Sequence, residues 1–108
     1  MDLDKKIGIL GLGESGYWAS ILAHELGYNV YISEQKNEVR NKYNNELKKR
    51  NIFVEYGEHS ENFLKSVDLI IKSPGIPKNS TIMKRISDKK IDVMSEIEFA
   101  SKFSKVRN

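Results

Sequence analysis

The chain has 108 residues, of which 39% are apolar, and its 18 basic and 15 acidic side chains give a formal net charge of +3. A globule of this length buries roughly 60–70% of the surface of its unfolded chain, enough for one sheet with helices on its faces but too little for a second substrate domain. We therefore expect residues 1–108 to form a single domain. The basic residues are spread along the sequence, so nucleic acid is not an expected partner.

The sequence contains no cysteine, and its two histidines, His24 and His59, are far apart. A disulfide framework and a thiolate metal site are therefore excluded, and no structural metal is expected. The first residues lack the apolar segment of a signal peptide, and the purely apolar runs are too short to span a membrane. These features predict a cytoplasmic protein without a membrane partner.

Short apolar runs alternate with longer amphipathic stretches, which is the pattern of a parallel sheet wound with helices. Strands are expected at 7–10, 29–33, 52–56, 67–71 and 91–94. A first helix has one buried face and stops at Gly27, where a left-handed C-cap is needed; the face comprises Ala19, Leu22, Ala23 and Leu26. The fold class is α/β, a Rossmann-like domain with a five-stranded parallel sheet in the order 3-2-1-4-5 and helices on both faces.

Apolar spacing and capping residues predict the other helices. A second helix is indicated by Val39, Tyr43 and Leu47, and a helical turn by residues 62–65. Asn79 or Ser80 is expected to cap a helix over the segment that contains Ile82, Met83 and Ile86. Ser95 and Glu98 have capping-box spacing and should open the last helix. Its inner face should carry Ile97, Ala100 and Phe103, with Ser101 outside.

A G-x-G-x-x-G motif, Gly11-Leu12-Gly13-Glu14-Ser15-Gly16, lies between the first strand and the first helix. In such a loop Gly11 permits the tight turn, Gly13 lets the backbone approach a pyrophosphate, and Gly16 lets the helix pack on the strand. The motif predicts a bound nucleotide diphosphate; the alternative is that these glycines serve only the turn and the packing. Glu34 ends the second strand, where an acidic side chain accepts hydrogen bonds from a ribose or base, unless it is a plain surface glutamate.

A second loop, Ser73-Pro74-Gly75-Ile76-Pro77, follows the fourth strand. In the expected strand order it faces the glycine loop across the topological switch point, where open α/β sheets bind ligands. Pro74 should hold Ser73 extended, and Gly75 can adopt a positive φ and offer its N–H. The alternative is a rigid connection without a ligand.

Four stretches together resemble the N-terminal domain of the Mur ligases, within that family the D-glutamate-adding branch, MurD: GLGESG at 11–16, LGYNVYISE at 26–34, DLIIKSPGIP at 68–77 and IDVMSEIEF at 91–99. The resemblance implies a domain that binds the UDP moiety of UDP-N-acetylmuramoyl-L-alanine in peptidoglycan precursor synthesis. It also implies that ATP and magnesium serve the full-length ligase through a central domain with a P-loop, and that a C-terminal domain helps to bind D-glutamate. Both domains are missing here, so this chain alone should be inactive, with no cofactor and no catalytic residue of its own.

The same resemblance assigns substrate contacts. Glu14 and Ser15 would flank the diphosphate and the uracil, and a carboxylate at Glu14 would have to turn to solvent to avoid repelling a pyrophosphate. The uracil end would meet Glu34, Gln35 and Lys36, and the other side of the diphosphate would meet Ser73, Pro74 and Gly75.

The two histidines are expected to be structural. His59 resembles the histidine of the G-x-H that Mur domains carry after the third strand, and it should make a structural hydrogen bond. His24 falls opposite the apolar face of the first helix and should be exposed.

Two other functions remain open. A stand-alone regulatory module that binds NAD, as in potassium-transport subunits, would share the glycine motif and the acidic residue after strand two. It has no reason to carry the Ser73–Pro77 loop. A scaffold domain without a ligand is the third possibility.

Overall fold

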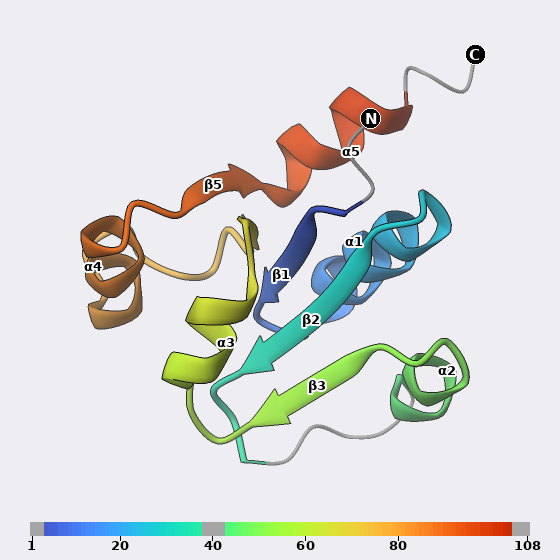
Figure 1. Cartoon of the computed structure of the whole chain (residues 1–108), viewed down its shortest axis with the longest axis horizontal. Helices are drawn as coiled ribbons and strands as arrows, with labels where there is room; N and C mark the ends of the chain where they lie inside the picture. Colours follow the sequence, from blue (N-terminus) through green and yellow to red (C-terminus); the bar gives the residue numbers. More distant parts are fainter. Residues whose placement is uncertain (1–3, 38–42, 105–108) are drawn as a thin grey trace.

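Strands and helices alternate along residues 4–37 and 43–104, which the computed structural model describes (Figure 1). The five strands found there are β1 (Lys6–Leu10), β2 (Asn29–Glu34), β3 (Phe53–Tyr56), β4 (Leu69–Lys72) and β5 (Asp92–Ser95). The five helices of the same ranges are α1 (Glu14–Glu25), α2 (Asn44–Lys49), α3 (Glu61–Ser66), α4 (Thr81–Asp88) and α5 (Glu96–Ser104).

The strands form one parallel sheet in the order β3-β2-β1-β4-β5. β1 is central, and its Ile9 pairs with Ile32 of β2 on one side and Ile71 of β4 on the other. The chain leaves β1 toward β2 and later returns to the other side of β1 as β4, so the winding direction reverses between these two strands. The expected sheet order and class are confirmed, and the switch point lies between β1 and β4.

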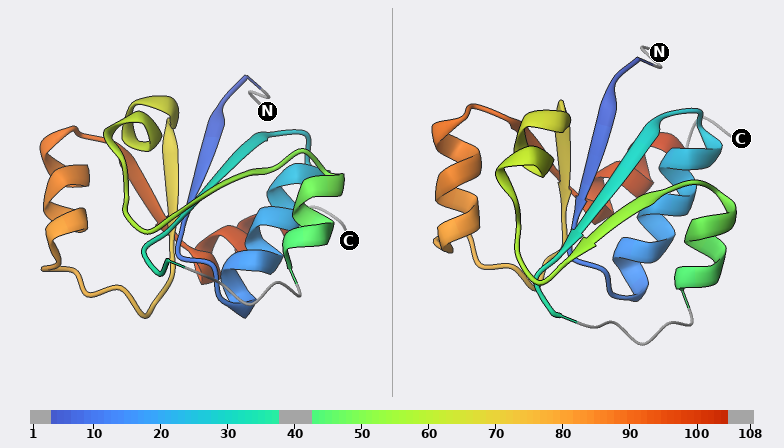
Figure 2. Two further views of the ribbon diagram at one scale, coloured as in Figure 1. Left: turned by 90° about the horizontal axis from the view of Figure 1, so that it is seen from below. Right: turned by 60° about the horizontal axis from the view of Figure 1, so that its bottom comes forward.

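Helices cover both faces of the sheet (Figure 2). On one face α1, α2 and α5 pack over Ile7, Ile9, Ile32 and Ile71, with Phe99 of α5 fully buried. On the other face α3 and α4 pack over alternate strand residues, and the apolar core there comprises Leu10, Phe63, Leu64, Val67, Ile70, Ile82 and Ile86. Strand side chains alternate between the two faces, so neighbouring residues such as Ile70 and Ile71 enter different cores.

Local signals end and begin the helices as expected. Gly27 follows α1 with φ +97° and donates its N–H to the His24 carbonyl at 3.0 Å. Ser80, rather than Asn79, caps α4 by accepting from the Met83 N–H at 3.4 Å. In the capping box of α5, the Glu98 N–H donates to Ser95 Oγ at 3.0 Å and the Ser95 N–H donates to Glu98 Oε1 at 3.2 Å.

The predicted inner face of the last helix is confirmed for Phe103, which packs against the core, and Ser101 is exposed as expected, but the prediction is wrong for Ile97 and Ala100. Ile97 is 74% exposed and Ala100 is exposed, whereas Phe99 is buried and Phe103 is half-buried. α5 begins directly after β5, so the capping box fixes its rotation and turns Phe99 toward α1. The Phe99 ring then meets the Phe103 ring at 4.8 Å between centroids.

The expectation for His24 of α1 is wrong, and the expected second helix is described only in part. His24 is half-buried rather than exposed, and its Nδ1 is buried without a hydrogen-bond partner among the described residues. The second helix begins at Asn44, with Tyr43 as its N-cap residue, and buries Leu47. Val39, the first residue of that predicted pattern, lies outside the described residues.

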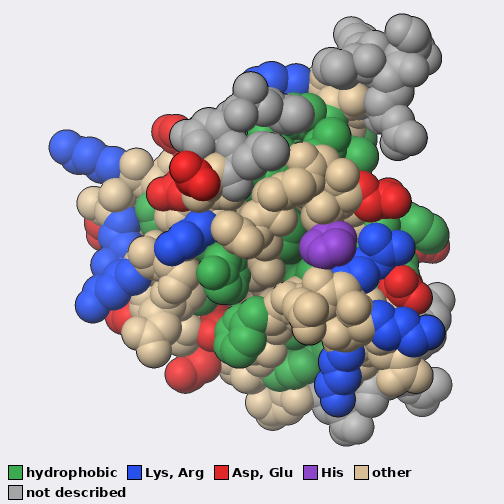
Figure 3. Space-filling model, turned by 45° about the vertical axis from the view of Figure 1, so that its right-hand side comes forward, with side chains coloured by type: hydrophobic (Ala, Val, Ile, Leu, Met, Phe, Trp, Pro, Cys, Tyr) green, Lys and Arg blue, Asp and Glu red, His purple; other side chains and the backbone are tan. Residues whose placement is uncertain are grey.

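Charged side chains of both signs are interspersed on the face shown in Figure 3. None of the described helices has the length and apolar character needed to cross a membrane.

Candidate functional site: a cleft at the carboxyl edge of the sheet

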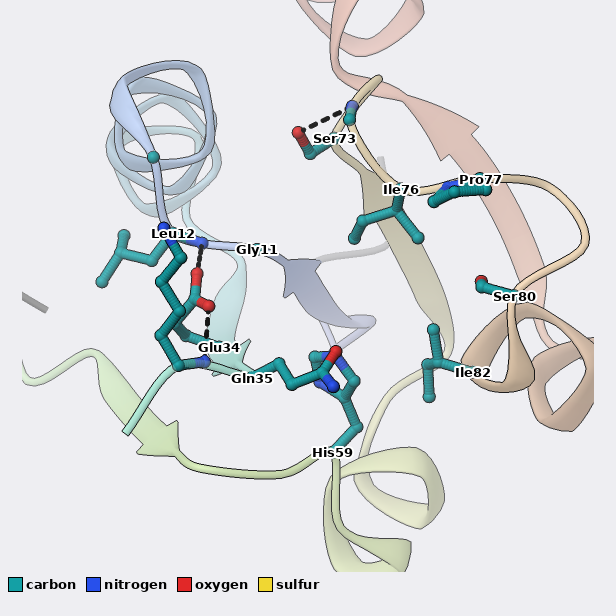
Figure 4. Close-up of a pocket in the computed structure, with 13 residues that line it drawn as sticks. Gly11, Leu12, Glu34, Gln35, His59, Ser73, Ile76, Pro77, Ser80 and Ile82 are labelled. Atoms are coloured by element: carbon teal, nitrogen blue, oxygen red, sulfur yellow. Dashed lines mark hydrogen bonds between the residues drawn. The ribbon is translucent and has the colours of Figure 1, made fainter. Parts of the chain in front are cut away.

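A cleft of about 820 Å³ opens at the edge of the sheet where the parallel strands end (Figure 4). Its volume falls within the roughly 300–1,000 Å³ range of small-molecule sites. The residues that line it come from the segments after β1, β2, β3 and β4 and from the start of α4: Gly11, Leu12, Gly13, Glu34, Gln35, Lys36, His59, Ser73, Gly75, Ile76, Pro77, Ser80 and Ile82.

The three glycines of the first loop have the three environments that the motif predicts. Gly11 has φ +98° and donates its N–H to the Ser33 carbonyl at 2.9 Å, which ties the turn to β2. A Cβ on Gly16 would lie 2.3 Å from the Gly11 carbonyl oxygen, so only glycine lets α1 pack so close to the loop. Among the described residues, a Cβ on Gly13 would meet no atom within 4 Å, because Gly13 faces open space at the start of α1.

Glu34 joins the glycine loop to the end of β2. Its Oε1 accepts from the Leu12 N–H at 2.7 Å and its Oε2 from the Lys36 N–H at 2.8 Å (Figure 4). A carboxylate can accept about four hydrogen bonds, so each oxygen keeps capacity for a ligand donor. Glu34 is therefore a half-buried part of the cleft rather than a plain surface glutamate.

The loop after β4 is held by a lysine. Lys72 Nζ donates to the carbonyl oxygens of Ile76 at 2.8 Å and Ser73 at 3.2 Å. Gly75 donates its N–H to Ser73 Oγ at 3.4 Å, and within the described parts of the chain that oxygen, at 3.8 Å, would be the one non-neighbouring atom within 4 Å of a Cβ on Gly75. The expected positive φ at Gly75 is not observed. The hydrogen bonds of Lys72 Nζ and of Ser73 Oγ hold this loop without a positive φ at Gly75.

A polar network lies at one end of the cleft. Ser33 Oγ donates to Glu55 Oε2 at 2.5 Å and lies 2.7 Å from His59 Nδ1. Ser60 donates to Glu55 twice, through its N–H at 2.9 Å and its hydroxyl at 2.5 Å. Burial by itself would raise the pKa of Glu55, but the hydrogen bonds from Ser33 and Ser60 outweigh it and bring that pKa below its ordinary value. The structural hydrogen bond expected of His59 is confirmed.

Burial lowers the pKa of His59, and Arg85 acts in the same direction. The negative charges of Glu55 and Glu34 oppose this shift without cancelling it. Arg85 also donates to the His59 carbonyl oxygen at 2.9 Å, which anchors the histidine loop to α4. This lowered pKa favours the neutral imidazole of His59 at pH 7.

Not all the substrate contacts inferred from sequence lie in the cleft. Gly11, Gly13, Glu34, Gln35, Lys36, Ser73 and Gly75 do. Gly16 is buried beneath the loop. Glu14, Ser15 and Pro74 instead line a groove of about 710 Å³ between α1 and α5, which also exposes Trp18 and Ile97. Glu14 is exposed there, as its charge requires, and the contacts assigned to these three residues stay predictions.

Several residues that line the cleft have no ligand contact assigned from the sequence: Leu12, His59, Ile76, Pro77, Ser80 and Ile82. Most of them could have been found from their position in the sequence, because they lie in the segments that follow predicted strands. Ile82 could not be found this way, since it belongs to the buried face of α4 and is only 7% exposed.

The cleft does not fit ATP with magnesium. Its glycine loop has no lysine, and the G-x-x-x-x-G-K-[ST] pattern is absent from the whole sequence. Among the described residues, no group of three or more histidine, aspartate or glutamate side chains is placed to hold a metal ion.

The matching family model and the curated relatives point to one family. Residues 5–95 match the family described as Mur ligase MurD-like, N-terminal domain. The chain is 44% identical over 104 residues to the UDP-N-acetylmuramoylalanine–D-glutamate ligase of Christiangramia forsetii, and 45% identical over 98 residues to that of Cytophaga hutchinsonii. These alignments cover 96% and 91% of this chain but only 23% and 22% of the relatives, so the chain spans less than a quarter of their length.

A solved structure supports the fold. The murein peptide ligase Mpl of Psychrobacter arcticus superimposes with a TM-score of 0.81 over 92% of this chain and 20% of its own, at 20% sequence identity.

Proposed function

The chain belongs to the family of MurD-like Mur ligase N-terminal domains, and on that premise we propose that it binds the UDP moiety of UDP-N-acetylmuramoyl-L-alanine. The observation that carries the proposal is the cleft between the glycine loop and the Ser73–Pro77 loop, on either side of the switch point. The relatives that share 44% and 45% identity are named for the ligation of D-glutamate to UDP-N-acetylmuramoylalanine.

The diphosphate lies between Gly13 and Gly75 in this proposal. Both positions are open in front of the backbone, so phosphate oxygens can approach the main chain closely. The N-terminus of α1 supplies further N–H groups, since its N-cap Gly13 has no side chain to occupy them. The N–H of Ser15 in this first turn is the contact proposed for that residue, while the exposed side chain of Glu14 stays in solvent.

The nucleoside occupies the other end of the cleft. There Glu34, Gln35 and Lys36 offer polar contacts, and Ile76 and Ile82 offer apolar ones. An apolar lining with a few polar groups is typical of small-molecule sites. Pro74, on the groove side of its loop, supports the diphosphate from behind.

The role of this domain is positioning. In the parent ligase, ATP would activate the carboxylate of the UDP-linked substrate and the amine of D-glutamate would attack it. ATP, magnesium and D-glutamate would be held by the central and C-terminal domains. We place that ligase in the cytoplasm. The NAD-binding regulatory module finds no support among these curated relatives, which are named as ligases.

Titration by NMR tests the proposal. We expect UDP to bind the 108-residue chain more tightly than NAD and to shift the amide signals of Gly13, Ser15 and Gly75. Affinity should be weak, because the sugar and peptide ends rest on domains that are absent here. Stronger binding of NAD would overturn the proposal.

The variant Gly75→Val tests whether the Ser73–Pro77 loop contacts the diphosphate. A valine there meets little in the free protein, so the fold should persist while the side chain blocks the approach of the diphosphate. We expect at least about a tenfold loss in UDP affinity, equivalent to about 1.4 kcal/mol. If Gly75→Val binds UDP as well as the parent does, the Ser73–Pro77 loop is only a connector.

A further inference from the structure

The imidazole of His59 points into the cleft beside the Gln35 side chain, across from Ile82 (Figure 4). Its Nδ1 is engaged with Ser33, whose side chain is fully buried. Its Nε2 makes no hydrogen bond within the described part of the chain, and it is not among the buried polar atoms that lack a partner there. The Nε2 edge of the ring is therefore available to a ligand.

The hydrogen bonds of Ser33 with Glu55 and His59 determine which ring nitrogen of His59 is protonated. Glu55 is ionised, so its oxygens only accept, and the single hydroxyl proton of Ser33 is donated to Glu55 Oε2 at 2.5 Å. Ser33 Oγ can then only accept from the ring. His59 Nδ1 must therefore be the N–H donor across the 2.7 Å contact.

A proton on Nδ1 determines what the other ring nitrogen of His59, Nε2, can do. A neutral imidazole with its proton on Nδ1 has a lone pair on Nε2, so Nε2 accepts hydrogen bonds and cannot donate them. The chain of Glu55, Ser33 and His59 spans β3, β2 and the loop before α3, so the tautomer is set by the packing of three segments. The cleft thus presents a fixed acceptor.

We infer that His59 Nε2 accepts a hydrogen bond from N3–H of uracil and makes the cleft prefer UDP to CDP. This inference rests on the proposed function, in which the base lies at this end of the cleft. Uracil carries a donor at N3, whereas cytosine carries a lone pair there that would face the lone pair of Nε2. A buried donor or acceptor left without its partner costs binding free energy, and this difference is the source of the discrimination.

The first experiment reads the tautomer directly. Long-range ¹H–¹⁵N spectra of the 108-residue chain near pH 7 should show the Nδ1–H tautomer for His59, and Ser33→Ala should lose that single form. A ring protonated on Nε2 in the parent protein would overturn the inference without any reference to a ligand.

The second experiment compares UDP and CDP by NMR titration in matched variants. We expect UDP to bind about tenfold more tightly than CDP, as one hydrogen bond allows. In His59→Asn the amide can still reach Ser33 but not the position of Nε2, so the ratio should fall to about one. In His59→Gln the longer amide reaches toward that position and should restore part of the preference.

The outcomes separate the two proposals. If UDP binds and the UDP-to-CDP ratio is unchanged in His59→Asn, the inference is wrong and the proposed function stands. If UDP does not bind the parent chain at all, the proposed function fails and the inference fails with it. If His59→Asn does not fold, the inference is tested by the UDP-to-CDP affinity ratios of His59→Gln and Ser33→Ala, together with the tautomer spectrum of the parent chain.

Discussion

Glycine residues of one motif have different physical roles in this protein. Gly16 fills a space in which a methyl group would overlap the Gly11 carbonyl oxygen, whereas Gly13 faces solvent. Substitution at the first should therefore disturb the fold, and substitution at the second should act on a ligand.

We predict that Gly16→Ala lowers the free energy of unfolding by about 3 kcal/mol, because α1 must move away from the loop to relieve the overlap. Gly13→Ala, the matched control, should cost about 1 kcal/mol or less, through the poorer capping preference of alanine. Urea unfolding followed by circular dichroism measures both. Equal losses in the two variants would contradict this account of the loop.

At the scale of elements, α5 depends on its capping box because it starts with no intervening loop after β5. We predict that Ser95→Ala costs about 1 kcal/mol, since the Glu98 N–H loses its acceptor. Ser101→Ala, in the exposed middle of the same helix, should be neutral within about 0.5 kcal/mol. Chemical denaturation of both variants tests this, and a loss in Ser101→Ala as large as in Ser95→Ala would show that capping is not the cause.

Helices α3 and α4 are linked through Glu61, which pairs with Lys89 at 2.8 Å and Arg85 at 3.0 Å. Hydrogen bonds from Lys89 and Arg85 lower the pKa of Glu61 from 4.5 to about 2. Because the pKa is lower in the folded state, the stabilisation is complete above pH 4.5 and is lost as the pH falls toward 2.

We predict that Glu61→Gln flattens the pH dependence of the melting temperature between pH 4.5 and pH 2. The effect at pH 7 should be small, because solvent screens the two partly exposed ion pairs of Glu61. Glu58→Gln, at an exposed carboxylate with no such pairing in the described structure, is the control. If the loss of stability between pH 4.5 and pH 2 is unchanged in Glu61→Gln, protonation of Glu61 is not its cause.

At the scale of the whole molecule, the ends of the parallel strands form one cleft, and the sequence contains no P-loop pattern for phosphoryl transfer. We predict that the purified 108-residue chain releases no phosphate from ATP above a buffer control, with or without UDP-N-acetylmuramoyl-L-alanine, D-glutamate and magnesium. The physical reason is the missing lysine and magnesium ligand of a P-loop. Turnover that survives repurification and disappears in a Glu34 variant would show that the chain is a complete enzyme.

Much of the fold follows from local sequence. Apolar runs placed the strands, Gly27 ended α1, and Ser80 and Ser95 opened α4 and α5, because each of these signals acts within a few residues of chain. The glycine motif and the family resemblance also brought Glu34 and the Ser73–Pro77 loop to one site. Parallel strands end at the same edge, so residues that follow different strands meet there.

What the sequence could not determine depends on contacts between segments. Ile97 faces out because the capping box and Phe99 set the rotation of α5. Glu14, Ser15 and Pro74 face the α1–α5 groove because each loop presents neighbouring residues to opposite sides. Gly75 needs no positive φ because Lys72 bridges its loop.

His59 shows the distinction most clearly. Its sequence context predicted a structural hydrogen bond, and that bond is present. Which ring nitrogen donates depends on the hydrogen bond from Ser33 of β2 to Glu55 of β3, residues that are 26 and 4 positions away from His59 in the sequence. Sequence determines which side chains exist and where strands end, but only the packed sheet brings a carboxylate, a hydroxyl and an imidazole into line and so decides what the cleft offers a ligand.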